Sequence, residues 1–289
     1  MSRIVIAGCG DIGRRIAALA AGKGLGVTGL VRSRESCDAL EQSGHACMQV
    51  DFGRPPLPPL DVADCDVIYL APPPRTGDTD PLIGNFLAAM QGVPRCFLYL
   101  STTGVYGDAD GDWIDESSPL DAQVDRARRR LDAERQVTEA AQVQGFDFLI
   151  IRVPGIYGPG RLPLARIRDR QPVLKADIAP FTNRIHADDL AAVTLDLLET
   201  GHNGEIYNVT DGHPSTMTDY FTKVARYAGL EPPPQIDMQT ARQQLSPGML
   251  SYLNESRKIS NAKLMRTIGI GLRFPTLDDG LEAIFGKPS

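Results

Sequence analysis

The sequence predicts an α/β fold with a doubly wound parallel sheet of about seven strands and a small C-terminal lobe. Strand-length runs of mostly apolar residues alternate with helical stripes through the first 155 residues. This alternation is typical of a parallel sheet covered by helices on both faces. Six such runs are enough for a complete doubly wound domain. The predicted strands are Arg3–Ala7, Gly26–Val31, Ala46–Phe52, Asp66–Ala71, Cys96–Ser101 and Phe146–Val153.

The composition changes after residue 155, where the segment Gly155–Phe181 is rich in proline, glycine and arginine. A helix is expected at Ala187–Glu199 and a strand at Glu205–Val209, and we predict that both return to the main sheet. The large domain should therefore span 1–155 together with this helix and strand. The segments 156–186 and 210–289 form the smaller lobe in this interpretation.

The net charge, the apolar runs and the cysteines limit what this protein can bind and where it can work. A net charge of −6 gives no basic surface for nucleic acid, and no apolar run approaches the roughly 18 residues of a membrane helix. The first strand begins too early to leave room for a signal peptide. The cysteines are odd in number and form no CxxC pair, so we expect neither a disulfide nor a metal site, in a cytoplasmic protein that acts on small molecules. They are Cys9, Cys37, Cys47, Cys65 and Cys96.

A glycine motif stands where the first strand turns into the first helix, in the sequence Gly8-Cys9-Gly10-Asp11-Ile12-Gly13. In this GxGxxG pattern Gly8 allows a tight turn, Gly10 lets a pyrophosphate approach the backbone, and Gly13 lets the helix pack closely on the sheet. The helix N-terminus faces the phosphates. With strand, helix and second strand all present, the motif predicts a Rossmann domain that binds a dinucleotide.

The end of the second strand indicates which dinucleotide binds. An NAD site usually has Asp or Glu here, which accepts hydrogen bonds from the ribose 2′-hydroxyl. This sequence instead has Arg32-Ser33-Arg34, which offers two guanidinium groups to a 2′-phosphate. We therefore expect NADP rather than NAD. The alternative is that both arginines are simply solvated in a surface loop.

Together with four later segments, these features resemble the extended short-chain dehydrogenase/reductase superfamily, and within it the NAD-dependent epimerase/dehydratase family. The resemblance covers nearly the whole chain. The four segments are Asp51-Phe52, Leu100–Gly107, Arg152–Gly160 and Arg184–Leu190. It implies that Asp51 contacts the adenine amino group, that Ala71-Pro72 lies along the cofactor, and that Pro154-Gly155 meets the nicotinamide.

The family's YxxxK motif is missing, which suggests an atypical branch. Relatives usually carry a glutamate four residues after the lysine, and Glu134 fits that position. Arg130 then stands at the lysine position and Arg126 at the tyrosine position. An arginine stays protonated at neutral pH, so it cannot replace tyrosine as a base, although it can stabilise an oxyanion. Both arginines could equally belong to a solvated helix face.

Two further residues are candidates for the catalytic site. Thr102 matches the family's active-site Ser/Thr and would orient a substrate oxygen, unless it only caps the loop after the fifth strand. Tyr106 is the nearest tyrosine that could act as the acid, although the tyrosine of this VYG segment is commonly a packing or substrate-contact residue in relatives.

These features predict an NADP-binding, epimerase/dehydratase-like or reductase-like enzyme. Its substrate would be polar, such as a nucleotide sugar, and its acid/base group would be non-standard. The alternative is a catalytically inactive NADP-binding or redox-sensing module. The resemblance also implies a homodimer formed through helices near 80–90 and 122–144, although three arginines on the second helix would disfavour that contact.

Overall fold

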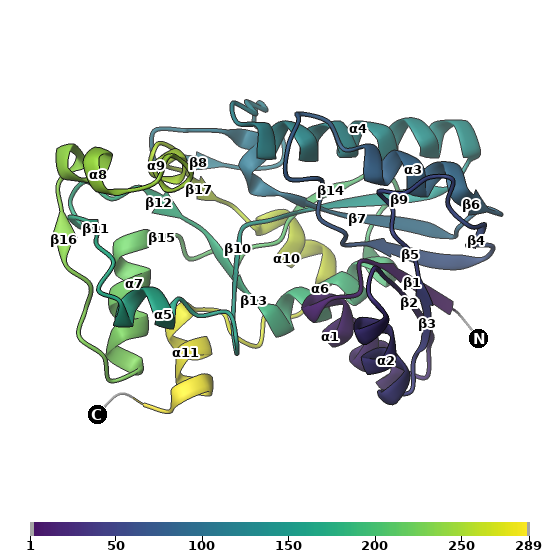
Figure 1. The fold of residues 1–289 in the computed structure, drawn as a ribbon, viewed down its shortest axis with the longest axis horizontal. Helices are drawn as coiled ribbons and strands as arrows, with labels where there is room; N and C mark the ends of the chain where they lie inside the picture. The colour runs from purple at the N-terminus through teal and green to yellow at the C-terminus, as the bar shows by residue number, and fades with distance from the viewer. Residues whose placement is uncertain (1–2, 288–289) are drawn as a thin grey trace. The chain divides into compact units, whose positions relative to one another are not determined.

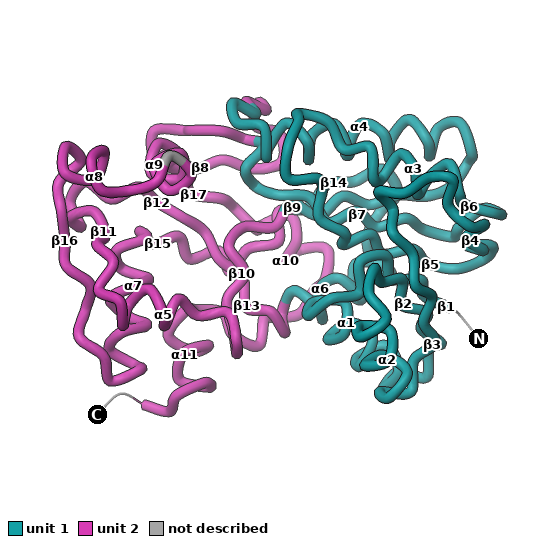
Figure 2. Tube along the Cα trace, in the orientation of Figure 1, with its two compact units in different colours: residues 1–105, 122–152, 190–207 teal, residues 106–121, 153–189, 208–289 magenta. Residues whose placement is uncertain are grey.

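The computed structural model describes residues 3–287, which divide into two compact units. The first unit comprises residues up to 105, 122–152 and 190–207, and the second comprises 106–121, 153–189 and 208 onward. Figure 2 shows them in different colours.

A seven-stranded sheet forms the centre of the first unit, in the order β14-β9-β7-β5-β1-β2-β3. β1 pairs in parallel with β2 and β5, β2 with β3, and β5 with β7. This topology confirms the predicted fold class. The strands are β1 Arg3–Ala7, β2 Gly26–Val31, β3 Ala46–Gln49, β5 Cys65–Tyr69, β7 Cys96–Thr102, β9 Asp147–Val153 and β14 Ile206–Asn208, and a separate short pair is β4 Leu60–Asp61 with β6 Met90–Gln91.

Helices cover both faces of this sheet, α3 and α4 on one face and α1, α2 and α6 on the other (Figure 1). They are α1 Asp11–Gly22, α2 Arg34–Gln42, α3 Pro81–Ala89, α4 Asp125–Gln144 and α6 Ala187–Thr200, with a 3₁₀ turn, η1, at Thr103–Tyr106. Fully buried aromatic rings from β5, β7 and α3, including Tyr69, Phe97 and Phe86, fill the space between the sheet and α3–α4. Among residues 3–287, no helix is both long and apolar enough to cross a membrane.

Short strand pairs and helices make up the second unit. One small core is built on Tyr157, Phe221 and Leu281, from β10, α7 and α11. The elements are β8 Trp113–Ile114, β10 Gly155–Tyr157, α5 Leu164–Arg168, β11 Val173–Leu174, β12 Phe181–Thr182, β13 Arg184–His186, β15 Ser215–Thr216, α7 Met217–Tyr227, β16 Gln235–Ile236, α8 Met238–Gln244, α9 Pro247–Leu253, β17 Lys258–Ile259, α10 Ala262–Ile268 and α11 Leu277–Phe285.

The expectation that the cysteines form no disulfide is wrong. Cys37 and Cys47 are joined by a disulfide, whereas Cys9, Cys65 and Cys96 remain thiols. The short connection after α2 folds the chain back, so that β3 brings Cys47 beside Cys37 on the helix. A pairing across a helix, a turn and a strand has no fixed sequence spacing, which is why a search for CxxC pairs missed it.

Candidate functional site

The glycine turn between β1 and α1 packs against the segment that follows β5. Gly8 has φ +79°, and a Cβ at this position would lie 2.6 Å from the backbone N and Cα of Ala71. Its amide donates to the Leu30 carbonyl at 2.9 Å, which ties the turn to β2 as well. Only glycine tolerates both this φ and this contact. The turn therefore lies where the strand order reverses, which is the usual ligand crevice of such sheets.

Gly10 and the start of α1 form a cradle that suits a pyrophosphate. A Cβ on Gly10 would meet only the Gly8 carbonyl oxygen, at 3.9 Å, so this side of the turn is open. No side chain caps the N-terminus of α1, which leaves its first amides to bind an anion. The space around Gly13 is tight instead, since a Cβ there would lie 3.0 Å from Cys9 Sγ. All three glycines thus have the environments that a dinucleotide-binding turn requires.

The other predicted residues near this turn have different environments. Asp11 Oδ1 accepts a hydrogen bond from Arg15 Nε at 3.2 Å, and Ile12 is a buried residue of the first turn of α1. Ala71 is buried, while Pro72 is exposed. The turn is therefore lined mainly by backbone atoms, and the side chains of Pro72 and Asp11 are accessible beside it.

A hollow of about 500 Å³ lies at the ends of β2 and β3, lined by Arg32, Gln49, Asp51 and Arg54. Gln49 Nε2 donates to the Arg32 carbonyl at 3.0 Å, which links the two strand ends. Arg54 Nε lies 3.3 Å from Asp51 Oδ2. The hollow thus combines two guanidinium groups, one carboxylate and one amide.

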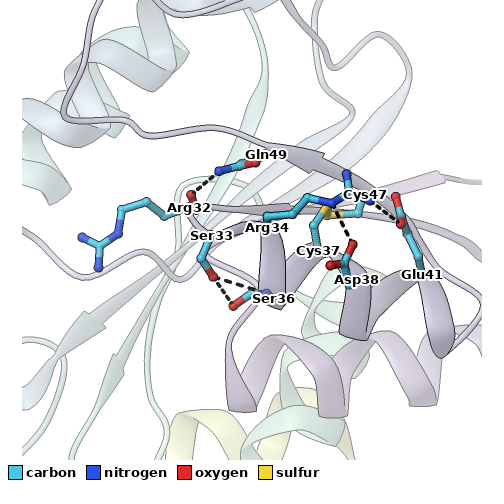
Figure 3. Close-up of a disulfide and its surroundings, with 9 residues drawn as sticks. All are labelled: Arg32, Ser33, Arg34, Ser36, Cys37, Asp38, Glu41, Cys47 and Gln49. Atoms are coloured by element: carbon cyan, nitrogen blue, oxygen red, sulfur yellow. Dashed lines mark hydrogen bonds and ion pairs between the residues drawn. A yellow bond between two sulfur atoms is a disulfide. The ribbon is translucent and has the colours of Figure 1, made fainter.

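Arg34 and Ser33 do not line this hollow. Arg34 is ion-paired along α2, with Nε 2.7 Å from Asp38 Oδ1 and Nη2 3.3 Å from Glu41 Oε2. Ser33 caps α2 by accepting a hydrogen bond from the Ser36 amide at 3.2 Å. Figure 3 shows the guanidinium groups of Arg32 and Arg34 pointing in opposite directions.

Phe52 follows Asp51 but faces the core. Its ring stacks on Tyr69 with centroids 5.9 Å apart and meets Phe86 edge-on at 5.4 Å. Phe52 is only 6% exposed, so its role in the turn is packing. Asp51 remains at the surface beside it.

Two residues of the hollow, Gln49 and Arg54, were not predicted from the sequence. Both lie close to the end of β3, which runs parallel to β2. Parallel neighbours end at the same edge of a sheet, so a basic residue just after the third strand belongs beside one just after the second. That rule would have identified Arg54 as a partner of Arg32.

Helix α4 is fixed to the sheet by a buried ion pair. Glu134 Oε2 lies 2.7 Å from Arg152 Nη2, Oε1 accepts from Arg152 Nε at 3.1 Å, and Ser101 Oγ donates to Oε1 at 2.5 Å. All three side chains are buried. Because Glu134 has this anchoring role, the alignment that gives Arg130 the lysine position and Arg126 the tyrosine position has a physical basis.

Arg130 reaches the carboxyl end of β7. Its Nη1 donates to the Leu100 carbonyl at 3.0 Å and to the Tyr99 hydroxyl at 3.2 Å. Burial raises the pKa of Tyr99 to about 12, so this phenol stays protonated at neutral pH. Arg126 lies half-buried in the first turn of α4. One positive side chain therefore stands at the end of β7, and the first turn of α4 carries no tyrosine.

Thr102 ends β7 and stabilises the turn that follows. Its Oγ1 accepts a hydrogen bond from the Gly104 amide at 3.2 Å. An accepting hydroxyl keeps its own hydrogen to donate. Thr102 can therefore cap η1 and also orient an oxygen atom of a ligand.

The remaining predicted residues belong to the second unit. Tyr106 is buried, and its hydroxyl donates to Asn208 Oδ1 at 2.9 Å. Pro154 is half-buried and Gly155 is exposed at the start of β10, where the Gly155 amide donates to the Asn183 carbonyl at 3.2 Å. These contacts give Tyr106 a packing environment and leave the Pro154-Gly155 turn accessible.

Comparisons with known proteins found one family that matches part of the chain and similar proteins that match most of it. A profile of the NAD dependent epimerase/dehydratase family matches residues 85–210. Protein YeeZ of Escherichia coli K12 is 28% identical over 254 residues, which cover 81% of this chain and 86% of YeeZ. A conserved protein of unknown function from Silicibacter pomeroyi DSS is 28% identical, with a TM-score of 0.84 over 98% of both chains. UDP-glucuronic acid 4-epimerase from Bacillus cereus, solved with NAD, shares the fold at 19% identity, with a TM-score of 0.74 over 97% of this chain and 96% of the epimerase.

Proposed function

We propose that this chain is a member of the NAD-dependent epimerase/dehydratase family, that it binds NADP, and that it acts on a small polar substrate of the nucleotide-sugar class. The substrate class is supported by the fold shared with UDP-glucuronic acid 4-epimerase. The bound nicotinamide would supply the hydride donor or acceptor. The acid/base group would differ from the family's tyrosine.

The hollow at the ends of β2 and β3 carries the cofactor assignment. Arg32 and Arg54 offer charge-assisted hydrogen bonds to a 2′-phosphate. The second strand also ends without the carboxylate that would hold a 2′-hydroxyl and repel a phosphate. Asp51 offsets part of the positive charge, and the family resemblance assigns its carboxylate to the adenine amino group. Arg32 is therefore the principal phosphate ligand in this proposal.

The residues at the end of β7 have complementary roles in the proposed chemistry. Both hydrogen bonds of Arg130 use Nη1, so its other donors can hold ribose hydroxyls or a developing oxyanion. The Thr102 hydroxyl can donate to a substrate oxygen. Arg126 cannot accept a proton, so the proton must move through a different group.

A second candidate function is an NADP-binding module without turnover, which senses the redox state of its cofactor. The identity of two side chains on α4 favours this second function. Arginine occupies both positions where relatives carry the tyrosine and lysine that support hydride transfer. The enzyme remains the first proposal because the second unit is a complete lobe that a pure binding module does not need.

Calorimetric titration of NADP⁺ and NAD⁺ tests the cofactor assignment. Arg32→Gln should raise the Kd for NADP⁺ about tenfold or more, because a charge-assisted contact to the phosphate is lost, and should leave that for NAD⁺ unchanged. Arg54→Gln should act in the same direction with a smaller effect. Arg34→Gln is the matched control and should change neither Kd, since Arg34 is ion-paired along α2. Equal losses for both cofactors would contradict the assignment of Arg32 to the 2′-phosphate.

Turnover separates the two candidate functions. An enzyme should consume NADPH, followed by its absorbance, when it receives a carbonyl compound of the right class, with keto forms of nucleotide sugars as the first panel. Tight NADP binding without turnover across a broad panel would favour the binding module. A pull-down should then capture a partner protein differently in the presence of NADP⁺ and of NADPH.

A further inference from the structure

The Cys37–Cys47 disulfide lies next to the hollow at the ends of β2 and β3. Cys37 is on α2, four residues after its cap Ser33, and Cys47 is on β3, two residues before Gln49. Figure 3 shows the disulfide beside the loop that carries Arg32 and Arg34. The disulfide therefore joins α2, which begins just after Arg32, to β3, which ends at Gln49 of the hollow.

β3 is the edge strand of the sheet, and among residues 3–287 its one strand neighbour is β2. The pairing runs from Thr28–Ala46 to Val31–Gln49. Its end is linked to the β2–α2 loop by the hydrogen bond from Gln49 Nε2 to the Arg32 carbonyl. Opening the disulfide removes the one covalent link between α2 and β3 beyond their short connection. The start of α2, and with it the loop before α2 that carries Arg32, should then be less fixed relative to β3.

The other three cysteines are buried free thiols in this structure. Burial raises the pKa of the Cys9 and Cys96 thiols to about 12 and also raises the pKa of Cys65. Buried thiols of this kind are poor nucleophiles because the thiolate is the reactive form. Cys47 is half-buried on the edge strand and is therefore the more accessible member of the pair, whereas Cys37 is 2% exposed.

We propose that Cys37 and Cys47 form a reversible thiol–disulfide switch that controls the affinity of the Arg32 hollow for the 2′-phosphate of NADP. The inference rests on the proposed function. In the oxidised state the disulfide holds α2 on β3 and fixes the hollow, which strengthens phosphate binding. In the reduced state the hollow loosens, while the glycine turn that binds the pyrophosphate is unaffected.

The redox step needs an external disulfide, such as oxidised glutathione. The Cys47 thiolate attacks one of its sulfur atoms, displaces a thiolate and forms a mixed disulfide. The Cys37 thiolate then attacks the Cys47 sulfur and displaces the second thiolate. The pair loses two electrons and two protons, and the external disulfide gains them as two thiols. An excess of reduced glutathione reverses both steps.

The test compares cofactor binding by the oxidised and the reduced full-length protein. Calorimetry measures the Kd for NADP⁺ and for NAD⁺ after treatment with oxidised or reduced glutathione, and mass spectrometry after thiol alkylation counts the cysteines that reacted. We expect reduction to weaken NADP⁺ binding about five- to tenfold and to change NAD⁺ binding less than about twofold. The Cys37→Ser/Cys47→Ser variant should match the reduced protein in both treatments. Cys96→Ser is the control and should keep the full response.

Three results would overturn the switch. One is an equal Kd for NADP⁺ in both redox states, and another is an equal shift for NADP⁺ and NAD⁺. The third is a disulfide that excess reduced glutathione fails to open. The wild-type comparison needs no variant, so it holds even if the double variant folds poorly. Absence of NADP⁺ binding in both states would instead refute the proposed function, and the switch with it.

Discussion

The glycine turn between β1 and α1 and the helix α4 match the proposed family's cofactor site to different extents. In the turn, Gly8, Gly10 and Gly13 all have the environments that a dinucleotide requires. In α4, the anchoring Glu134 is kept, but arginines stand at the tyrosine and lysine positions. The two regions belong to one sheet-and-helix unit, so a general loss of structure does not explain the difference.

This contrast separates two requirements that relatives meet together. Binding a pyrophosphate depends on backbone geometry, and the chain keeps every glycine that this geometry needs. Transferring a proton depends on the chemistry of one side chain, which can change while the helix stays in place. We therefore expect cofactor binding and turnover to be separable in this protein, and each region can be tested alone.

The largest effect is expected from Glu134→Gln, which tests the anchor of α4. The substitution leaves the buried Arg152 guanidinium without its carboxylate, which costs about 3–5 kcal/mol of unfolding free energy. Chemical denaturation followed by circular dichroism measures it. Glu139→Gln removes the same charge from an exposed pair with Arg135 on α4 and should leave the denaturation midpoint unchanged. A small effect of Glu134→Gln would remove the physical basis for placing Arg126 and Arg130.

A smaller effect, limited to the cofactor, is expected from Gly10→Ala. The added Cβ has room in the protein, with its nearest neighbour at 3.9 Å, but it occupies the side where a pyrophosphate would approach. The Kd for NADP⁺ should rise about tenfold to a hundredfold, equivalent to about 1.4–2.7 kcal/mol, with little change in Tm. Gly26→Ala is the control because a Cβ there meets nothing within 4 Å. Unchanged NADP⁺ binding by Gly10→Ala would contradict the assignment of the Gly10 turn as the pyrophosphate site.

Patterns within a single element predicted most of the fold. β1 and β2 begin and end where their apolar runs do, because those runs fill buried positions on both faces of the sheet. The third strand was expected to reach Phe52 but ends at Gln49. Beyond that point the chain leaves the strand, and the Phe52 ring turns into the core. A mostly apolar segment therefore does not mark where strand pairing stops.

The hollow was predicted only in part because its side chains depend on several elements. Arg34 was assigned to the phosphate, but a helix that begins after Ser33 places Asp38 one turn away, where an i,i+4 ion pair forms. Arg54 can be assigned to the hollow only when β3 is known to lie beside β2. The same tertiary information is needed to predict the Cys37–Cys47 disulfide. Sequence patterns located the site, whereas tertiary neighbours decided which side chains belong to it.

The smallest effect is expected from Arg130→Met, which asks whether α4 contributes to cofactor binding at all. Loss of the guanidinium at the end of β7 should weaken NADP⁺ binding about three- to tenfold, because donors to the ribose are removed while the glycine turn remains. Arg130→Lys restores the family's residue and should stay within about twofold of the wild type. Arg128→Met, on the exposed side of the same helix, should have no effect. If Arg130→Met also binds NADP⁺ normally, α4 keeps only its structural role, and cofactor binding depends on the glycine turn and the Arg32 hollow alone.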